Sequence, residues 1–335
     1  MLEDGSLVDL SPVTGELDGA FLAGGGLERA RDALDRGNLP ALDAGGRVGP
    51  PVARPGKVVC IGLNYRDHAE ETGAPLPPEP VLFLKDPGTV IGPDDQVLVP
   101  RGSSRTDYEV ELAVVVGRRA RYLAGPEEAA GHVAGYAVAN DVSEREFQLE
   151  RNGGQWDKGK SCETFNPLGP WLVTADQVGD PQRLGLRTWV NGEPRQDGST
   201  KDMVFGVHHL VWYLSQFMVL EPGDVIDTGT PAGVALGRPD HPYLRPGDLV
   251  ELEIDGLGRQ RQRFAQAQRR VGELEELLLH VHAQRQDLCQ AERDPRSVLE
   301  AHVRAPALRA AQGISPAWQG IGSTRRASRA STRTT

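Results

Sequence analysis

Three carboxylates alternate along the segment TDYEVELAVVVG at residues 106–117. Because side chains two positions apart in a β-strand project from the same face, the spacing predicts that Asp107, Glu109 and Glu111 share one face. A solvated acidic face is one explanation of this pattern. The alternative is a metal site, because the segment then becomes wholly apolar and enters a core, where repulsion and desolvation penalise ionised acids. A bound divalent cation would remove both penalties.

A third carboxylate for such a site is expected where a neighbouring strand ends. The segment YAVANDVSER places Asp141 at the end of the apolar run GYAVA. An Asx turn that caps the strand is the simpler alternative. Together with Glu109 and Glu111, Asp141 would form an oxygen-only ligand set, which favours Mg²⁺, Mn²⁺ or Ca²⁺ over zinc and leaves coordination positions for water and substrate.

A nucleotide-binding motif is present by letter but not by context. Residues 154–161, GQWDKGKS, match the pattern GxxxxGK[ST], which in a P-loop follows a buried strand and opens a helix. Here the preceding residues are polar, and the following ones run into Pro167 and Pro170. We therefore reject nucleotide hydrolysis and retain Lys158 and Lys160 as cations beside the acidic site, with an exposed surface role as the alternative for each.

Strands must position these residues, because short apolar runs bounded by turn residues dominate the middle of the chain. One longer apolar segment, FGVHHLVWYLSQFMVL, predicts a helix over residues 205–220. Strands without regular alternation with helices favour a β-rich α+β fold over a doubly wound parallel sheet. The predicted strands are KVVCIG, VLFLK, QVLVP, YEVELAVVVG, HVAGYAVAND, GPWLVT, LRTWVNGE, DVIDTG and DLVELEIDG.

Composition divides the chain into three parts. Residues 1–54 are predicted to form a small N-terminal domain and linker, with short strands at SLVDL and ELDGAFL and a helix over GLERARDALDRG. Residues 55–264 form the main domain. Residues 265–335 form a C-terminal extension rich in Gln, Ala and Arg, in which residues 271–281 could be helical and the low-complexity end is predicted to be disordered.

Charge and composition exclude several classes of function. The formal net charge of -10 argues against a nucleic-acid surface, and no apolar run has the length of a membrane span or the features of a secretory signal. Cys60, Cys162 and Cys289 are odd in number and far apart, which fits a reducing cytosol rather than a disulfide framework. We expect a cytoplasmic protein with a small-molecule substrate, captured by a local cation if it is anionic.

Six segments together resemble the fumarylacetoacetate hydrolase family in order and spacing. The resemblance covers about residues 55–264 and leaves the C-terminal extension without a counterpart. It implies a mixed β-sheet roll with a small N-terminal domain, usually assembled as a homodimer. The segments are NYRDHAEE, FLKDPG, TDYEVELAVVVG, NDVSERE, GKSCETFNPLGPW and DTGTPAGVALG.

The resemblance also implies a metal centre and a water-activating dyad. Family members hold the metal on a Glu-x-Glu pair and a following Asp, which this sequence matches at Glu109, Glu111 and Asp141; Mg²⁺ or Mn²⁺ is implied, with Ca²⁺ as a further candidate. The metal chelates the carboxylate and 2-oxo oxygen of the substrate. His68 and Glu71 match the dyad, and a separation of one helical turn would let the carboxylate orient the imidazole. A structural role is the alternative for His68.

Further residues are expected to contact the substrate. Lys160 matches a family lysine that stabilises the enolate or alkoxide developing on the substrate. In the GTPAG segment, the hydroxyl and amide groups could complete an oxyanion site, with a tight turn as the alternative. The residues predicted to bind the substrate are Lys85, Arg145, Gln155, Lys158, Gly229 and Thr230.

One enolate intermediate serves several activities in this family. Similar sites cleave the C–C bond of acylpyruvates and other 2,4-dioxo acids, decarboxylate oxaloacetate, or isomerise and hydrate unsaturated 2-oxo acids. The His68–Glu71 pair favours water activation, so we expect a metal-dependent hydrolase that acts on an acylpyruvate or a diketo-deoxy sugar acid through a metal-stabilised enolate. A decarboxylase, isomerase or hydratase is the alternative on the same site, and a catalytically silent metal- or ligand-binding protein is the alternative from another class.

Overall fold

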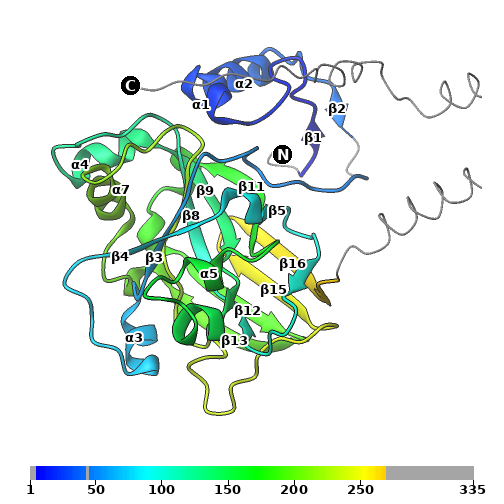
Figure 1. The fold of residues 1–335 in the computed structure, drawn as a ribbon. Coiled ribbons are helices and arrows are strands. Elements are labelled where there is room, and N and C mark those ends of the chain that lie inside the picture. The colour runs from blue at the N-terminus through cyan, green and yellow to red at the C-terminus, as the bar shows by residue number, and fades with distance from the viewer. Residues whose placement is uncertain (1–4, 43–44, 269–335) are drawn as a thin grey trace, which may run out of the picture. The chain divides into compact units, whose positions relative to one another are not determined.

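The computed structural model describes residues 5–42 and 45–268, and two mixed β-sheets form the centre of its fold (Figure 1). The larger sheet has seven strands, of which two neighbouring pairs are parallel and the others antiparallel. In spatial order its strands are β4 (Val81–Lys85), β3 (Val58–Gly62), β14 (Val225–Asp227), β8 (Val110–Val116), β9 (Val133–Asn140), β11 (Asn166–Thr174) and β5 (Val90–Ile91).

The second sheet has five strands, and a tight hairpin turn joins two of them. Asn191 and Gly192 both have positive φ, as a two-residue hairpin turn requires. In spatial order the strands are β13 (Glu193–Ser199), β12 (Gly185–Val190), β15 (Leu249–Ile254), β16 (Gly258–Gln266) and β6 (Val97–Val99). Two short pairs complete the strands, β1 (Leu7–Val8) with β2 (Ala41–Leu42) and β7 (Thr106–Asp107) with β10 (Ser143–Glu144).

Strand β8 is buried on both faces, and its alternation separates the core from the acidic residues. On one face Val110 and Leu112 join the main hydrophobic core, which they share with Leu252 of the second sheet. Because side chains alternate along a strand, Glu111 projects to the opposite face, on the same side as Ala113. The fold therefore places the acids on the face of the larger sheet that does not pack on the main core.

The helices are short and lie around the two sheets (Figure 1). The predicted helix over residues 205–220 is shorter than expected, because Leu220 turns back and pairs its backbone with Ala120. The α-helices are α1 (Gly19–Ala23), α2 (Gly26–Asp35), α3 (Arg66–Thr72), α4 (Pro126–Ala129), α5 (Asp157–Lys160), α6 (Ala175–Val178) and α7 (Val207–Ser215).

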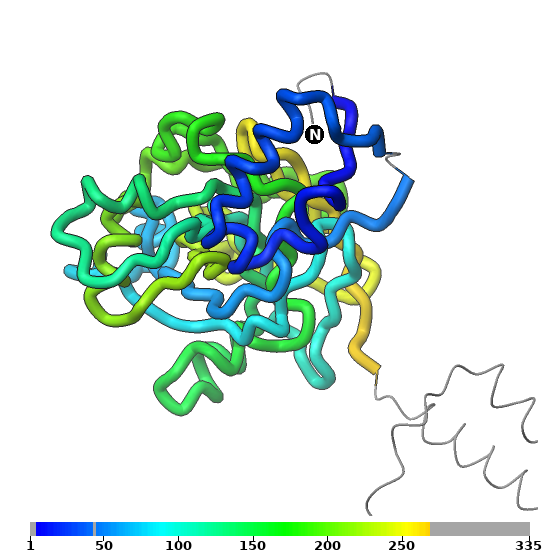
Figure 2. The backbone as a smooth tube through the Cα atoms, turned by 90° about the horizontal axis from the view of Figure 1, so that it is seen from above, coloured from blue at the N-terminus to red at the C-terminus, as the bar shows by residue number. Residues whose placement is uncertain are grey.

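The leading residues pack on the body of the protein. Phe21 and Leu22 share a hydrophobic cluster with Val115 and Ala134 of the larger sheet, and Figure 2 shows this dark-blue segment beside the rest of the chain. The predicted strand at ELDGAFL is wrong: Asp18 accepts a hydrogen bond from the amide of Phe21 at 2.9 Å and so caps helix α1. The helix predicted at GLERARDALDRG is present as α2.

The end of the described chain is a strand. β16 continues to Gln266, two residues beyond the predicted end of the main domain at residue 264. The helix predicted at 271–281, the predicted disordered end and Cys289 lie outside the described residues. Within residues 5–42 and 45–268, none of the helices has the length and apolar character needed to cross a membrane.

Candidate active site

A cavity of about 550 Å³ lies on the acidic face of the larger sheet. This volume falls within the range of small-molecule sites, roughly 300–1,000 Å³. The predicted residues that line it are His68, Glu71, Glu109, Glu111, Asp141, Arg145, Lys160, Gly229 and Thr230.

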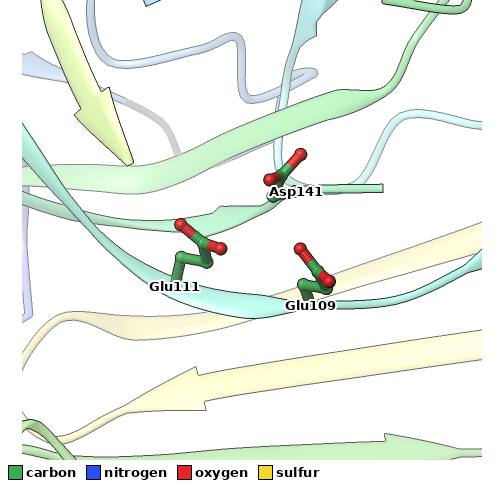
Figure 3. A group of neighbouring side chains, drawn as sticks. All are labelled: Glu109, Glu111 and Asp141. Atoms are coloured by element: carbon green, nitrogen blue, oxygen red, sulfur yellow. The ribbon is translucent and has the colours of Figure 1, made fainter. Parts of the chain in front are cut away.

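Three buried carboxyl groups form one cluster in this cavity (Figure 3). Glu109 directly precedes β8, Glu111 is the second residue of that strand, and Asp141 directly follows the neighbouring strand β9. One oxygen from each of the three lies within 4.8 Å of the others. The backbone amide of Asp141 donates to the carbonyl of Glu109 at 3.0 Å and joins the two strands at this point. The predicted ligand set is therefore brought together.

Lys160 bridges two of these acids. Its Nζ donates to Glu109 Oε2 at 2.7 Å and to Asp141 Oδ2 at 2.6 Å. The ammonium group also lies 5.0 Å from the centre of the Phe83 ring. Burial opposes ionisation of Lys160, but the charges of Asp141 and Glu109 outweigh it and raise the pKa of this lysine above its ordinary value.

Two other buried cations, Arg145 and Lys85, form ion pairs with the neighbouring acids. Arg145 donates to Asp107 at 2.9 Å and to Glu109 at 2.6 Å. The strand predicted over these acids is interrupted, because β7 ends at Asp107 and β8 begins at Val110. Asp107 does not line the cavity and instead accepts from two backbone amides of the loop after β14. Lys85 pairs with Asp141 but does not line the cavity either. It therefore does not lie where the predicted contact with the substrate would require it.

Glu111 is the acid without a cation. Lys85, Arg145 and Lys160 form a continuous chain of ion pairs with three carboxylates, Asp107, Glu109 and Asp141. Within the described residues, Glu111 belongs to no ion pair and accepts a hydrogen bond from the amide of Gly229 at 2.7 Å.

The surroundings of the two glutamates have opposite effects on their pKa values. Burial, reinforced by the charges of Asp141 and Glu109, raises the pKa of Glu111 well above its ordinary value. Burial also opposes ionisation of Glu109, but Arg145 and Lys160 outweigh it and hold the pKa of that carboxyl well below its usual range. The residues thus fit a divalent cation: three oxygen donors converge, and within the described residues one of them is a buried carboxyl without an ion pair.

The predicted dyad faces the same cavity. His68 and Glu71 lie one turn apart on α3, with 3.4 Å between Nδ1 of the imidazole and the carboxylate. Glu71 also accepts from the amide of Gly233 at 2.9 Å. The carboxylate is therefore held between the imidazole and a loop, an arrangement that orients the ring for proton transfer.

The GTPAG segment lines the cavity with its donors engaged. The amide of Gly229 donates to Glu111, and the hydroxyl of Thr230 donates to the carbonyl of Val110 at 2.9 Å and accepts from Gln196. A role as oxyanion donors stays a prediction and would require these hydrogen bonds to be exchanged.

Besides Lys85, two further predicted substrate contacts lie outside the cavity. Gln155 and Lys158 are exposed and are not among the lining residues, and Lys158 donates to the backbone carbonyl of Arg151. The P-loop context is absent as well. A π-helix at Glu146–Glu150 precedes the motif in place of a strand, and the chain then continues to strand β11.

Several lining residues carry no sequence signal that predicts their place. The wall is largely apolar, and Gln148, Arg238 and His241 add polar groups to it. Arg238 and His241 follow the GTPAG segment in a loop without a repeating pattern. The apolar residues that sequence reasoning missed are Ile61, Leu63, Phe83, Leu149, Trp156 and Leu236.

Comparisons with known proteins agree with this geometry. Residues 57–265 match the fumarylacetoacetate (FAA) hydrolase C-terminal family. A Burkholderia cenocepacia protein, provisionally named a hydrolase, is 50% identical over 265 residues, which cover 79% of this chain and 93% of the relative.

Two solved structures share the fold. The fumarylacetoacetate hydrolase of Exiguobacterium antarcticum has a TM-score of 0.68 and 37% identity over 79% of this chain and 94% of its own. The 2-hydroxyhepta-2,4-diene-1,7-dioate isomerase of Mycobacterium marinum has a TM-score of 0.58 and 35% identity over 68% of this chain and 84% of its own. The predicted fold and family are thus confirmed, and an enzymatic role is supported. The chain belongs to the fumarylacetoacetate hydrolase family.

Proposed function

We propose that this enzyme is a divalent-metal-dependent hydrolase that cleaves a C–C bond in a small 2,4-dioxo acid, either an acylpyruvate or a diketo-deoxy sugar acid. The observation that carries the proposal is the uncompensated carboxyl of Glu111, which lies beside Glu109 and Asp141 in the cavity that also contains His68 and Glu71. The proposed metal ligands and the proposed water-activating dyad thus line one cavity.

Glu109, Glu111 and Asp141 would hold the metal, with Mg²⁺ or Mn²⁺ favoured by the oxygen donors. When bound, the ion supplies Lewis-acid stabilisation of negative charge on the oxygens of the substrate. Lys160 adds a fixed cation next to the proposed metal ligands, because its two ion pairs hold the ammonium group between Glu109 and Asp141. A preorganised cation in a dry site stabilises an enolate oxygen as it becomes charged.

The dyad would supply the nucleophile. With the Nδ1 proton donated to Glu71, Nε2 of His68 is available to take a proton from water. The hydroxide attacks the distal ketone carbon, the bond between that carbon and C3 breaks, and its electron pair becomes the enolate of pyruvate. Protonation at C3 then gives pyruvate, and the distal fragment leaves as a carboxylic acid. One water molecule is consumed for each bond cleaved.

Isomerisation is the second candidate, favoured by the likeness to the Mycobacterium marinum isomerase. An isomerase moves a proton between carbon atoms of an unsaturated 2-oxo acid and needs no attack by water. The same enolate-stabilising groups would serve it. Hydrolysis leads because the His68–Glu71 pair is held by a separate hydrogen bond from Gly233.

The test is a turnover screen of the full chain with Mg²⁺ or Mn²⁺ against acylpyruvates, diketo-deoxy sugar acids, oxaloacetate and unsaturated 2-oxo dicarboxylic acids. We expect stoichiometric pyruvate from at least one 2,4-dioxo acid and loss of that activity in EDTA. Double-bond migration without pyruvate would favour the isomerase, and activity that survives EDTA would contradict the metal requirement.

A homodimer and a cytoplasmic location belong to the same proposal. The family resemblance supports the dimer, and the odd, dispersed cysteines support a reducing compartment. Light scattering of the purified chain measures the first, and fractionation of the source cells tests the second.

A further inference from the structure

We propose that Arg238 forms a second anion-binding subsite in the cavity, so that the preferred substrate is a 2-oxo acid with a further carboxylate at its distal end. This inference rests on the proposed function, because it assumes that the first carboxylate and the 2-oxo group lie at the Glu109–Glu111–Asp141 cluster. It selects, within the proposed substrates, those whose acyl group ends in a carboxylate.

Arg238 differs from the other Lys and Arg side chains of the cavity. Arg145 and Lys160 are almost fully buried, and each pairs with two carboxylates. Arg238 is 34% exposed and lines the same cavity. Within the described residues, its one ion pair is with Asp240. Arg238 is therefore the cavity cation that remains available to a ligand.

The contact with Asp240 is weak enough to be replaced. Nε of Arg238 lies 3.6 Å from Oδ1 of Asp240, beyond the distance of a good hydrogen bond. Asp240 is 65% exposed, and ion pairs of this kind contribute little. Nε itself is buried and has no hydrogen-bond partner within the described residues. A ligand carboxylate would instead pair with the exposed part of the guanidinium group, in place of Asp240.

The loop that carries Arg238 is fixed against the dyad. Gly237 approaches Glu71 so closely that a Cβ on this glycine would lie 2.2 Å from the carboxyl carbon of Glu71. Earlier in the loop, the amides of Ala235 and Leu236 donate to Asp107. In the proposed reaction His68 and Glu71 activate water beside the distal ketone, so Arg238 belongs to the side of the cavity that receives the distal fragment.

The remaining wall explains why a cation is needed for an anionic distal end. Leu63, Trp156 and Leu236 are apolar and suit a carbon chain, whereas Glu71 would repel a carboxylate. A guanidinium group can bind a carboxylate through two parallel hydrogen bonds, and a half-exposed one loses less hydration than a buried one. A neutral sugar-like end would leave the charge of Arg238 unused.

Equilibrium binding tests this inference without requiring turnover. Calorimetry with saturating Mn²⁺ would compare 2-oxoglutarate, 2-oxoadipate and 2-oxopimelate with the 2-oxo monocarboxylic acid of the same chain length. The proteins are the wild type, Arg238→Gln, Arg238→Lys and the control Arg183→Gln. Arg183 also pairs with a nearby exposed aspartate, at 3.4 Å, but lies outside the cavity.

We expect the wild type to bind at least one dicarboxylate about 10–100-fold more tightly than its monocarboxylate, the range for hydrogen bonds to a charged group. Arg238→Gln should abolish this preference without weakening monocarboxylate binding, Arg238→Lys should retain part of it, and Arg183→Gln should retain all of it. Equal binding of both acid types by the wild type, or a preference that survives in Arg238→Gln, would overturn the inference alone. Failure of every 2-oxo acid to bind would contradict the proposed function and this inference together.

Discussion

Glu109 and Glu111 are two residues apart at the beginning of β8, yet their hydrogen-bond partners differ. Glu109 accepts from Arg145 and Lys160, whereas Glu111 accepts from the backbone amide of Gly229 and belongs to no ion pair in the described part of the chain. Removing one partner of a buried ion pair lowers stability, whereas a buried charge without a partner is itself destabilising. The same substitution should therefore destabilise the protein more at Glu109 than at Glu111.

Glu109→Gln should lower the free energy of unfolding of the metal-free protein by about 2–3 kcal/mol, less than the roughly 3–5 kcal/mol for a fully broken buried pair. The loss is partial because Arg145 keeps Asp107 and Lys160 keeps Asp141. Glu111→Gln should change it by less than about 1 kcal/mol or raise it, since the amide oxygen can still accept from Gly229. Urea denaturation in EDTA measures both. Equal destabilisation would show that Glu111 has a counter-charge after all.

His68 should separate hydrolysis from decarboxylation. Hydrolysis needs a base to make water nucleophilic, whereas decarboxylation of a 2-oxo acid needs only stabilisation of the departing electron pair. His68→Ala should reduce C–C hydrolysis by about 10²-fold or more and any oxaloacetate decarboxylation much less. Lys160→Ala should damage both reactions. Steady-state kinetics of both variants on both substrates is the measurement, and proportionate losses in His68→Ala would argue against a dedicated water base.

At the scale of elements, the loop after β14 keeps the dyad in place. Glu71 accepts from the amide of Gly233, and Gly237 leaves room for its carboxylate. Gly237 does not have a positive φ, so alanine is compatible with its backbone and would act through its Cβ alone. This glycine is therefore a positioning residue for Glu71.

Gly237→Ala should displace the carboxylate of Glu71 and lower hydrolysis by about 10-fold, part of the 10²-fold or greater loss expected without the base. Gly131→Ala is the matched control, since a Cβ there meets nothing within 4 Å. Shortening the displaced side chain with Glu71→Asp in the Gly237→Ala background should restore part of the rate. A rate that Glu71→Asp does not restore in the Gly237→Ala background would assign this glycine a purely structural role.

Sequence periodicity predicted the elements whose burial follows a simple pattern. Asp107, Glu109 and Glu111 alternate with apolar residues, so their proximity around the start of β8 was predictable. β13 and β16 were missed because their residues are mostly polar. In β16, Gln260 and Gln262 are fully buried, and their amides donate to backbone carbonyls, which alternation of apolar residues does not identify. Arg238 was missed because tertiary folding alone brings its loop to the cavity.

At the scale of the whole molecule, the residues through Gln268 form one compact unit. Its last strand, β16, pairs with β6, and the amide of Ala267 donates to Val99. The family match ends at residue 265. The cavity residues that the proposed chemistry uses all lie within this described unit.

Truncation after residue 268 should leave metal binding, turnover and the proposed dimer intact. The removed segment contains none of the cavity residues and none of the strand pairs described above. Kinetics and light scattering of the truncated and full-length chains make the comparison. A truncated protein that is insoluble, monomeric beside a dimeric parent, or inactive would give the C-terminal extension a structural role.

The most direct test of the metal centre is a calorimetric titration with Mn²⁺ of the wild type and Glu111→Gln. Because the pKa of Glu111 is raised, this residue holds a proton more readily than an ordinary glutamate, and a metal must displace that proton. We predict one site in the wild type, affinity that rises with pH, release of up to about one proton per ion, and no measurable binding to Glu111→Gln. A wild type that does not bind Mn²⁺, or a Glu111→Gln variant that binds it with wild-type affinity, would contradict the account.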